Sequence, residues 1–225
     1  MRLREATLIF GLVCAVPACT SLGLSSTGPV HLAPLSESSD DSWKKTLTES
    51  TRRVEVYEAG VRQADLRATL VTPRLRRAFL ASRAGFHGRF SQEAERDLIA
   101  LGNPDEGVDE KMKSKPDAEE QVLVFVAMYV SDQKDRDLAA SYTIWDSQLV
   151  RGDARAAPIK METLRLSPAV SAMFPYVDRF DDVYLMRFPL MDVQGHPFLS
   201  SGGAPLRLEV KSVLANATVE WTLSD

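Results

Sequence analysis

Residues 122–130 of the chain spell VLVFVAMYV, an unbroken row of apolar and aromatic residues. Beyond the N-terminal region this is the longest apolar stretch of the sequence. It has the length of a strand, far short of the roughly 20 apolar residues that a membrane-spanning helix needs. A short apolar run bounded by polar residues is typical of a strand that is buried in a folded body. The stretch therefore predicts a β-rich globular core.

The sequence after this stretch continues in short extended segments. They are SYTIWDSQLV (141–150), APIKMETLRL (157–166), VYLMRFPLMD (183–192), LRLEVKS (206–212) and ATVEWTLS (217–224). In the last segment Val219, Trp221 and Leu223 alternate with polar residues, as in a half-exposed strand. About six to eight strands at short spacing, without alternating helices, predict a mainly β protein of α+β content built as an antiparallel β-sandwich.

A helical insert is predicted in the N-terminal part of the body, at about 72–102. Thr72 has the residue type of a helix cap and Pro73 that of a first helical position, and a second helix is expected over 91–102. Residues 43–71 fit helix, strand or one after the other. We expect one globular domain over 43–225.

The N-terminus has the features of an export signal. Arg2 and Arg4 precede the apolar run ATLIFGLVCAV (6–16). This run is too short to span a bilayer and fits the apolar region of a signal peptide, which we assign to residues 1–18. The net charge of −4 provides no basic surface, so nucleic-acid binding is not expected.

The stretch Val16-Pro17-Ala18-Cys19 resembles the lipobox of bacterial lipoproteins. The resemblance implies that the Cys19 thiol is diacylated and that the chain is cut just before Cys19. Pro17 departs from the small residues that are common at its position. Ordinary secretory cleavage after Ala18 is the alternative, and it would leave Cys19 as an unmodified thiol.

The lipoprotein resemblance also implies a location. Thr20 follows the cysteine, which in enteric-type lipoproteins favours the outer membrane. Residues 19–42 are rich in small and polar residues and predict a flexible tether, with His31 solvated in it. The membrane, contacted through lipid on Cys19, is thus the expected partner, on either the periplasmic or the outer face.

The body resembles uncharacterised envelope lipoproteins of myxobacteria and their relatives. The resemblance is carried by the strand from Trp145 to Leu149, the FPY turn at 174–176, the strand VYLMRFP (183–189) and the final Glu220-Trp221. It implies a fold and a location and no activity.

A search for catalytic residues finds only isolated candidates. His31, His87 and His196 stand outside any nucleophile motif. Asp181 and Asp182 lie beside aromatic residues, but neighbours on a strand face opposite ways. The sequence therefore predicts no catalytic, cofactor-binding or metal-binding residue and no small-molecule ligand.

Four polar segments are interpreted as loops and turns. They are 103–120, SDQKDRD (131–137), RGD (151–153) and SSGG (200–203). The first two contain acidic residues but lack the spacing of a calcium loop.

The sequence thus favours a membrane-anchored envelope lipoprotein with a non-enzymatic binding or structural role toward another envelope component, such as an envelope protein. The alternative is a lipid-anchored hydrolase acting on an envelope glycan or peptide. That alternative would need His87 or His196 beside a carboxylate in a concave site.

Overall fold

The computed structural model describes residues 28–32, 40–83, 121–166 and 168–225. Several sequence-based predictions concern residues outside these ranges. They are the signal peptide 1–18, Cys19, His87, the second helix at 91–102 and the loop 103–120.

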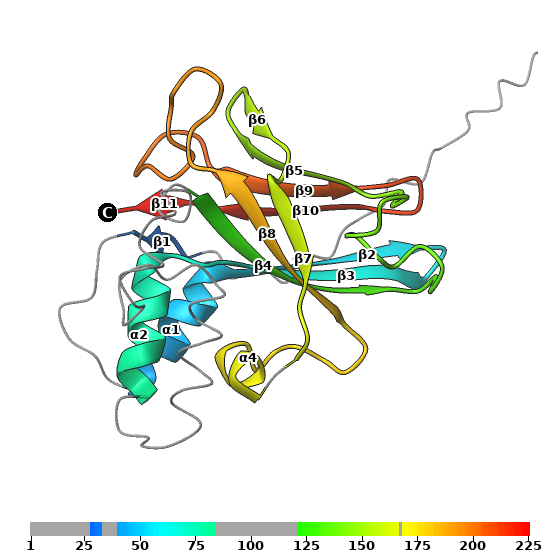
Figure 1. Ribbon diagram of the computed structural model, residues 1–225, viewed down its shortest axis with the longest axis horizontal. Helices are drawn as coiled ribbons and strands as arrows, with labels where there is room; N and C mark the ends of the chain where they lie inside the picture. The colour runs from blue at the N-terminus through cyan, green and yellow to red at the C-terminus, as the bar shows by residue number, and fades with distance from the viewer. Residues whose placement is uncertain (1–27, 33–39, 84–120, 167) are drawn as a thin grey trace, which may run out of the picture.

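Two antiparallel sheets pack face to face, which confirms the predicted β-sandwich (Figure 1). One sheet has the strand order β2-β3-β4-β8-β7: Thr51–Glu58, Val61–Leu70, Gln121–Val130, Asp182–Pro189 and Lys160–Thr163. The other has the order β10-β9-β5-β6: Asn216–Trp221, Leu206–Lys211, Asp146–Arg151 and Ala154–Ala156. β7 falls within the predicted extended segment 157–166, whereas β6 was not expected, because three residues are too few to show a pattern in the sequence.

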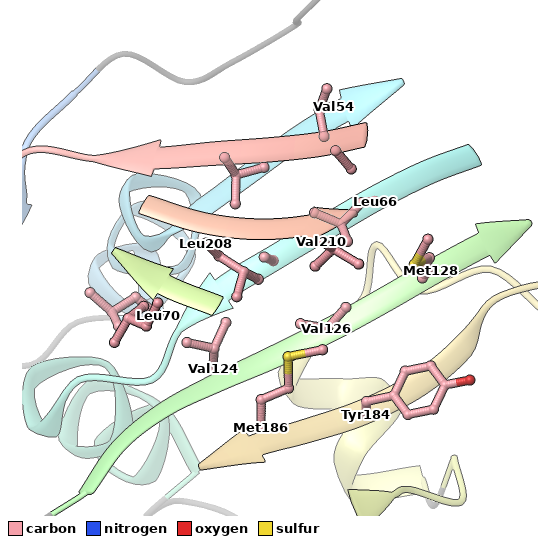
Figure 2. Packing of buried hydrophobic residues seen from close by; sticks show 14 of the residues in the cluster. Val54, Leu66, Leu70, Val124, Val126, Met128, Tyr184, Met186, Leu208 and Val210 are labelled. Atoms are coloured by element: carbon pink, nitrogen blue, oxygen red, sulfur yellow. The ribbon is translucent and has the colours of Figure 1, made fainter. Parts of the chain in front are cut away.

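Strand β4 lies in the middle of the five-stranded sheet and is buried on both faces. Its residues Val124, Val126 and Met128 point into the sandwich core between the sheets (Figure 2). The alternate residues Leu123 and Phe125 point to the opposite face and join a second apolar cluster. Because successive side chains of a strand face opposite ways, a strand covered on both sides must be apolar throughout. This accounts for the unbroken stretch VLVFVAMYV.

In the described part of the chain, three helices cover the outer face of the five-stranded sheet (Figure 1). They are α1 (Asp40–Ser50), α2 (Pro73–Arg83) and α4 (Pro168–Met173). The predicted start of α2 is confirmed, since Thr72 Oγ1 accepts a hydrogen bond from the Leu75 amide at 3.2 Å. The region 43–71, left open by the sequence, forms a helix followed by two strands. None of the described helices combines the length and the apolar character needed to cross a membrane.

Residues 28–32 belong to the body rather than to a free tether. Strand β1 (Val30–His31) pairs in parallel with β11 (Leu223–Ser224), and the side chain of Val30 is buried in the sandwich core. His31 Nδ1 lies 2.8 Å from Ser224 Oγ. The prediction of a flexible tether over 19–42 with a solvated His31 is therefore corrected at 28–32. The buried Val30 and the hydrogen bonds from the Val30 and Leu32 amides attach this segment to the body.

We expect Leu66→Ala to lower the free energy of unfolding by about 2–5 kcal/mol, because Leu66 is fully buried between the sheets and truncation leaves a cavity. Val61→Ala on the same strand is the matched control. Its side chain is 58% exposed, so a change within about 0.5 kcal/mol is expected. Urea denaturation followed by tryptophan fluorescence measures both, and equal losses would contradict the assigned core.

Candidate functional site

A pocket of about 510 Å³ lies between the β5–β6 turn and the connection from β8 to β9. We call it the loop pocket. Its lining comprises Arg151, Asp153, Ala154, Asp192, Gln194, His196, Pro197, Phe198 and Ser200–Ala204. The volume falls in the range of roughly 300–1,000 Å³ that small-ligand sites occupy. The pocket is the candidate site of this protein.

Arg151, the last residue of β5, holds one wall of the pocket in place. Its guanidinium donates hydrogen bonds to the carbonyls of Phe198, Ser200, Gly202 and Ala204, at 2.6, 2.7, 2.5 and 3.1 Å. These carbonyls belong to every second residue of the connection, which therefore curls around a single side chain. The bonds to Phe198 and Ser200 are partly buried and those to Gly202 and Ala204 are exposed, and none of these four carbonyls belongs to a described strand ladder. The Arg151 guanidinium supplies the hydrogen bonds that a neighbouring strand would otherwise donate.

The curl of this wall depends on glycine. Gly202 and Gly203 have φ values of 70° and 73°, which residues with a Cβ rarely adopt. The Gly202 amide also donates to the Leu223 carbonyl at 3.2 Å. The wall is thus joined to β11, the same strand that binds the N-terminal segment.

Asp192 fixes the opposite wall by closing a tight turn. Its Oδ1 accepts hydrogen bonds from the backbone amides of Gln194 and His196, both at 2.8 Å. Its Oδ2 lies 3.3 Å from His196 Nδ1. These hydrogen bonds favour the ionised carboxylate and lower the pKa of Asp192, and the bond from the His196 amide has the largest effect. The carboxylate is therefore occupied by the turn itself.

The remaining polar groups of the pocket are free. In the described part of the chain, the side chains of Asp153, Gln194, Ser200 and Ser201 make no hydrogen bond. Burial lowers the pKa of the Arg151 guanidinium, although such a group stays charged in water. Four neutral or acidic side chains with unused donors and acceptors thus face the pocket.

Asp181 and Asp182 do not act as a pair, in line with the sequence argument. Asp181 accepts a hydrogen bond from the Asp178 amide at 2.7 Å and lies 3.6 Å from Arg67. Asp182 forms a separate ion pair with Arg136 at 3.3 Å. Burial raises the pKa of both carboxyls. Their different partners exclude a shared proton.

Asp65 is the centre of a second charged cluster, on the outer face of β2 and β3. Its carboxylate is almost fully buried and contacts Arg53, Arg62 and Arg67 at 2.7, 3.2 and 3.0 Å. Burial opposes ionisation, but the hydrogen bond from Arg53 and the charges of Arg67 and Arg53 together lower the pKa of Asp65. Since the acid is fully paired, the cluster has a structural role.

The other residues singled out in the sequence fall into two groups. Trp145 and Trp221 are buried, and the Trp221 indole donates to the Ser50 carbonyl at 2.8 Å, so both belong to the core. His196 lines the loop pocket beside Asp192, whereas His31 lies at the β1–β11 pair.

The sequence did not single out the residues of the pocket as a site. It correctly predicted turns at 151–153 and 200–203. It gave no sign that two turns about fifty residues apart meet, because neither carries a periodic pattern or a motif. An isolated arginine at a strand end beside a later Ser-Gly segment is the only available signal, and it is weak.

No group of histidine, cysteine, aspartate and glutamate side chains suited to hold a metal ion occurs within the described ranges. Comparison with known proteins gives no match to any family model, curated protein or solved structure. The site is therefore interpreted from its own geometry.

We expect Asp65→Asn to lower the free energy of unfolding by about 3 kcal/mol, because it leaves three arginines without their shared carboxylate. A lowered pKa in the folded state means that Asp65 stabilises the fold above about pH 4 and loses this effect as the pH falls further. The wild type should thus lose its advantage over the variant below pH 4. Urea titrations across pH measure this, with Asp146→Asn as the exposed control.

We expect Arg151→Lys to speed hydrogen–deuterium exchange across 198–204, since one ammonium group cannot reach four carbonyls. Arg155→Lys, on the exposed strand β6, should leave that exchange unchanged. Unaltered exchange in Arg151→Lys would show that the wall is held by other contacts.

Proposed function

We propose that this protein is a lipid-anchored component of a bacterial cell envelope, held at the outer membrane by acyl chains on Cys19, with a non-enzymatic binding role. The observation that carries the proposal is the sequence of the N-terminus. A positive start, an apolar run of signal-peptide length and Val16-Pro17-Ala18-Cys19 follow one another in the order of a lipoprotein signal. Two or more acyl chains hold a protein firmly, since each buried methylene contributes about 0.8 kcal/mol.

The attachment of β1 to the body limits how far the body can lie from an anchor at Cys19. Nine residues along the chain lead from Cys19 to Gly28, where the described structure begins. A chain of that length spans at most about 32 Å. A body anchored through Cys19 would therefore be held close to the membrane, at the end of the sandwich that carries β1 and β11.

The contacts in the loop pocket favour binding over catalysis. His196 is hydrogen-bonded to Asp192 alone among the described residues, and its side chain is 72% exposed. Nucleophilic catalysis needs a hydroxyl or thiol that is hydrogen-bonded to the histidine. The described part of the chain places no such group on His196.

Two large apolar side chains are exposed at the opposite end of the sandwich. Tyr142 is 83% exposed in the β4–β5 connection and Val213 is 92% exposed in the β9–β10 turn. In Figure 1 the β9–β10 turn lies at the end of the sandwich away from β1 and β11. Single exposed apolar side chains are normal on protein surfaces, and only a contiguous patch marks a contact site.

A lipid-anchored hydrolase acting on an envelope glycan or peptide is the second candidate. One observation favours it, namely a histidine beside a carboxylate, His196 with Asp192, in a concave site. The pair is closed within a single turn, however, and the carboxylate is occupied by two backbone amides.

We expect the protein extracted from membranes to have the mass of a chain that starts at Cys19 plus its acyl chains. Intact-mass spectrometry measures this, and Cys19→Ser should abolish both the added mass and the membrane retention. Cys14→Ser, within the predicted signal peptide, is the matched control and should change neither. An unmodified chain starting at residue 19 would contradict the anchor and indicate ordinary secretory cleavage.

A further inference from the structure

The loop pocket is formed before any ligand binds. Arg151 fixes the wall 198–204 with four hydrogen bonds, and Asp192 fixes the turn 192–196 with two backbone bonds. A site whose loops are already ordered does not lose that conformational entropy on binding. The pocket therefore has the rigidity of a binding site.

The hydrogen-bonding groups of the pocket disfavour an anion. Four of the five N–H groups of Arg151 point to loop carbonyls, so the guanidinium cannot form a two-pronged contact with a phosphate or carboxylate. Asp153 and Asp192 add two negative charges to the lining. A phosphate in the pocket would face these charges without a free cation.

The free groups instead fit a ligand rich in hydroxyls. Asp153 accepts hydrogen bonds, whereas the Gln194 amide and the hydroxyls of Ser200 and Ser201 both donate and accept. A sugar hydroxyl also does both, so it can use each of these groups. The exposed imidazole of His196 adds a flat surface with an unused Nε2.

We propose that the loop pocket binds a neutral saccharide, without cleaving it. The inference rests on the proposed function for its setting, because the Gly202 amide joins the pocket wall to β11, and β11 binds the segment leading to Cys19. The pocket wall and the first described residues of the chain are thus both attached to β11. The ligand of the pocket is a glycan near the membrane, either a glycolipid headgroup or a free saccharide.

Hydrogen–deuterium exchange of the full membrane-extracted protein tests this. The protein is placed in phosphatidylcholine nanodiscs, which carry no sugar, and exchange is followed over 192–204. The probes are free mono- and disaccharides of glucose, galactose and N-acetylglucosamine, nanodiscs containing a galactosyl diacylglycerol, and inorganic phosphate. We expect slower exchange with a saccharide probe, and the free and membrane-displayed probes tell the two sources apart.

The variant Asp153→Ala with Gln194→Ala removes two free side chains without touching Arg151 or Asp192. It should weaken saccharide binding at least tenfold. The control, Asp146→Ala with Gln133→Ala, changes exposed residues of the same types outside the pocket and should bind as the wild type does. Unchanged binding in the pocket variant overturns the inference.

Two further results would also overturn it. One is that phosphate, and no saccharide, slows hydrogen–deuterium exchange over 192–204. The other is that no saccharide probe slows this exchange. Neither result affects the acyl mass on Cys19, so the proposed anchor would stand. Conversely, the extracted wild-type protein could lack the acyl mass while a saccharide still slows exchange over 192–204. That result would refute the anchor and leave the pocket assignment intact.

Discussion

The burial of β4 on both faces is the constraint on which the rest of the structure depends. One face of this strand closes the sandwich core with the four-stranded sheet, and the other supports α1, α2 and α4. Each layer on its own would leave an apolar surface in water, at a cost of about 25 cal/mol per Å². The three layers are therefore stable only together, and the loops that form the pocket are held at the edge of this assembly.

A second constraint acts at the pocket itself. The connection between β8 and β9 is long and irregular, so most of its carbonyls have no partner in a strand ladder. Arg151 satisfies four of them from the end of β5. The loop backbone thus uses most of the hydrogen-bonding capacity of the guanidinium. The neutral and acidic side chains around it remain as the groups available to a ligand. The chemistry of the pocket follows from how its wall is held.

Local signals in the sequence predicted much of the fold. The apolar run at 122–130, the alternation of Val219, Trp221 and Leu223, and the cap at Thr72 each depend on residues close together in the chain. The docking of Val30 against β11 was not predictable in this way. It joins residues almost two hundred positions apart, and two paired residues leave no periodic pattern.

The sequence by itself determined the predominance of strands, the antiparallel sandwich and the turns at 151–153 and 200–203, and it predicts an export signal ending at Cys19. Only the tertiary structure decided that these two turns meet, that Arg151 is enclosed by carbonyls, and that β11 binds both the pocket wall and residues 30–31. The physical reason is that strand patterns reflect local burial. A pocket between loops depends instead on how distant strand ends are brought together, and no local residue pattern records it.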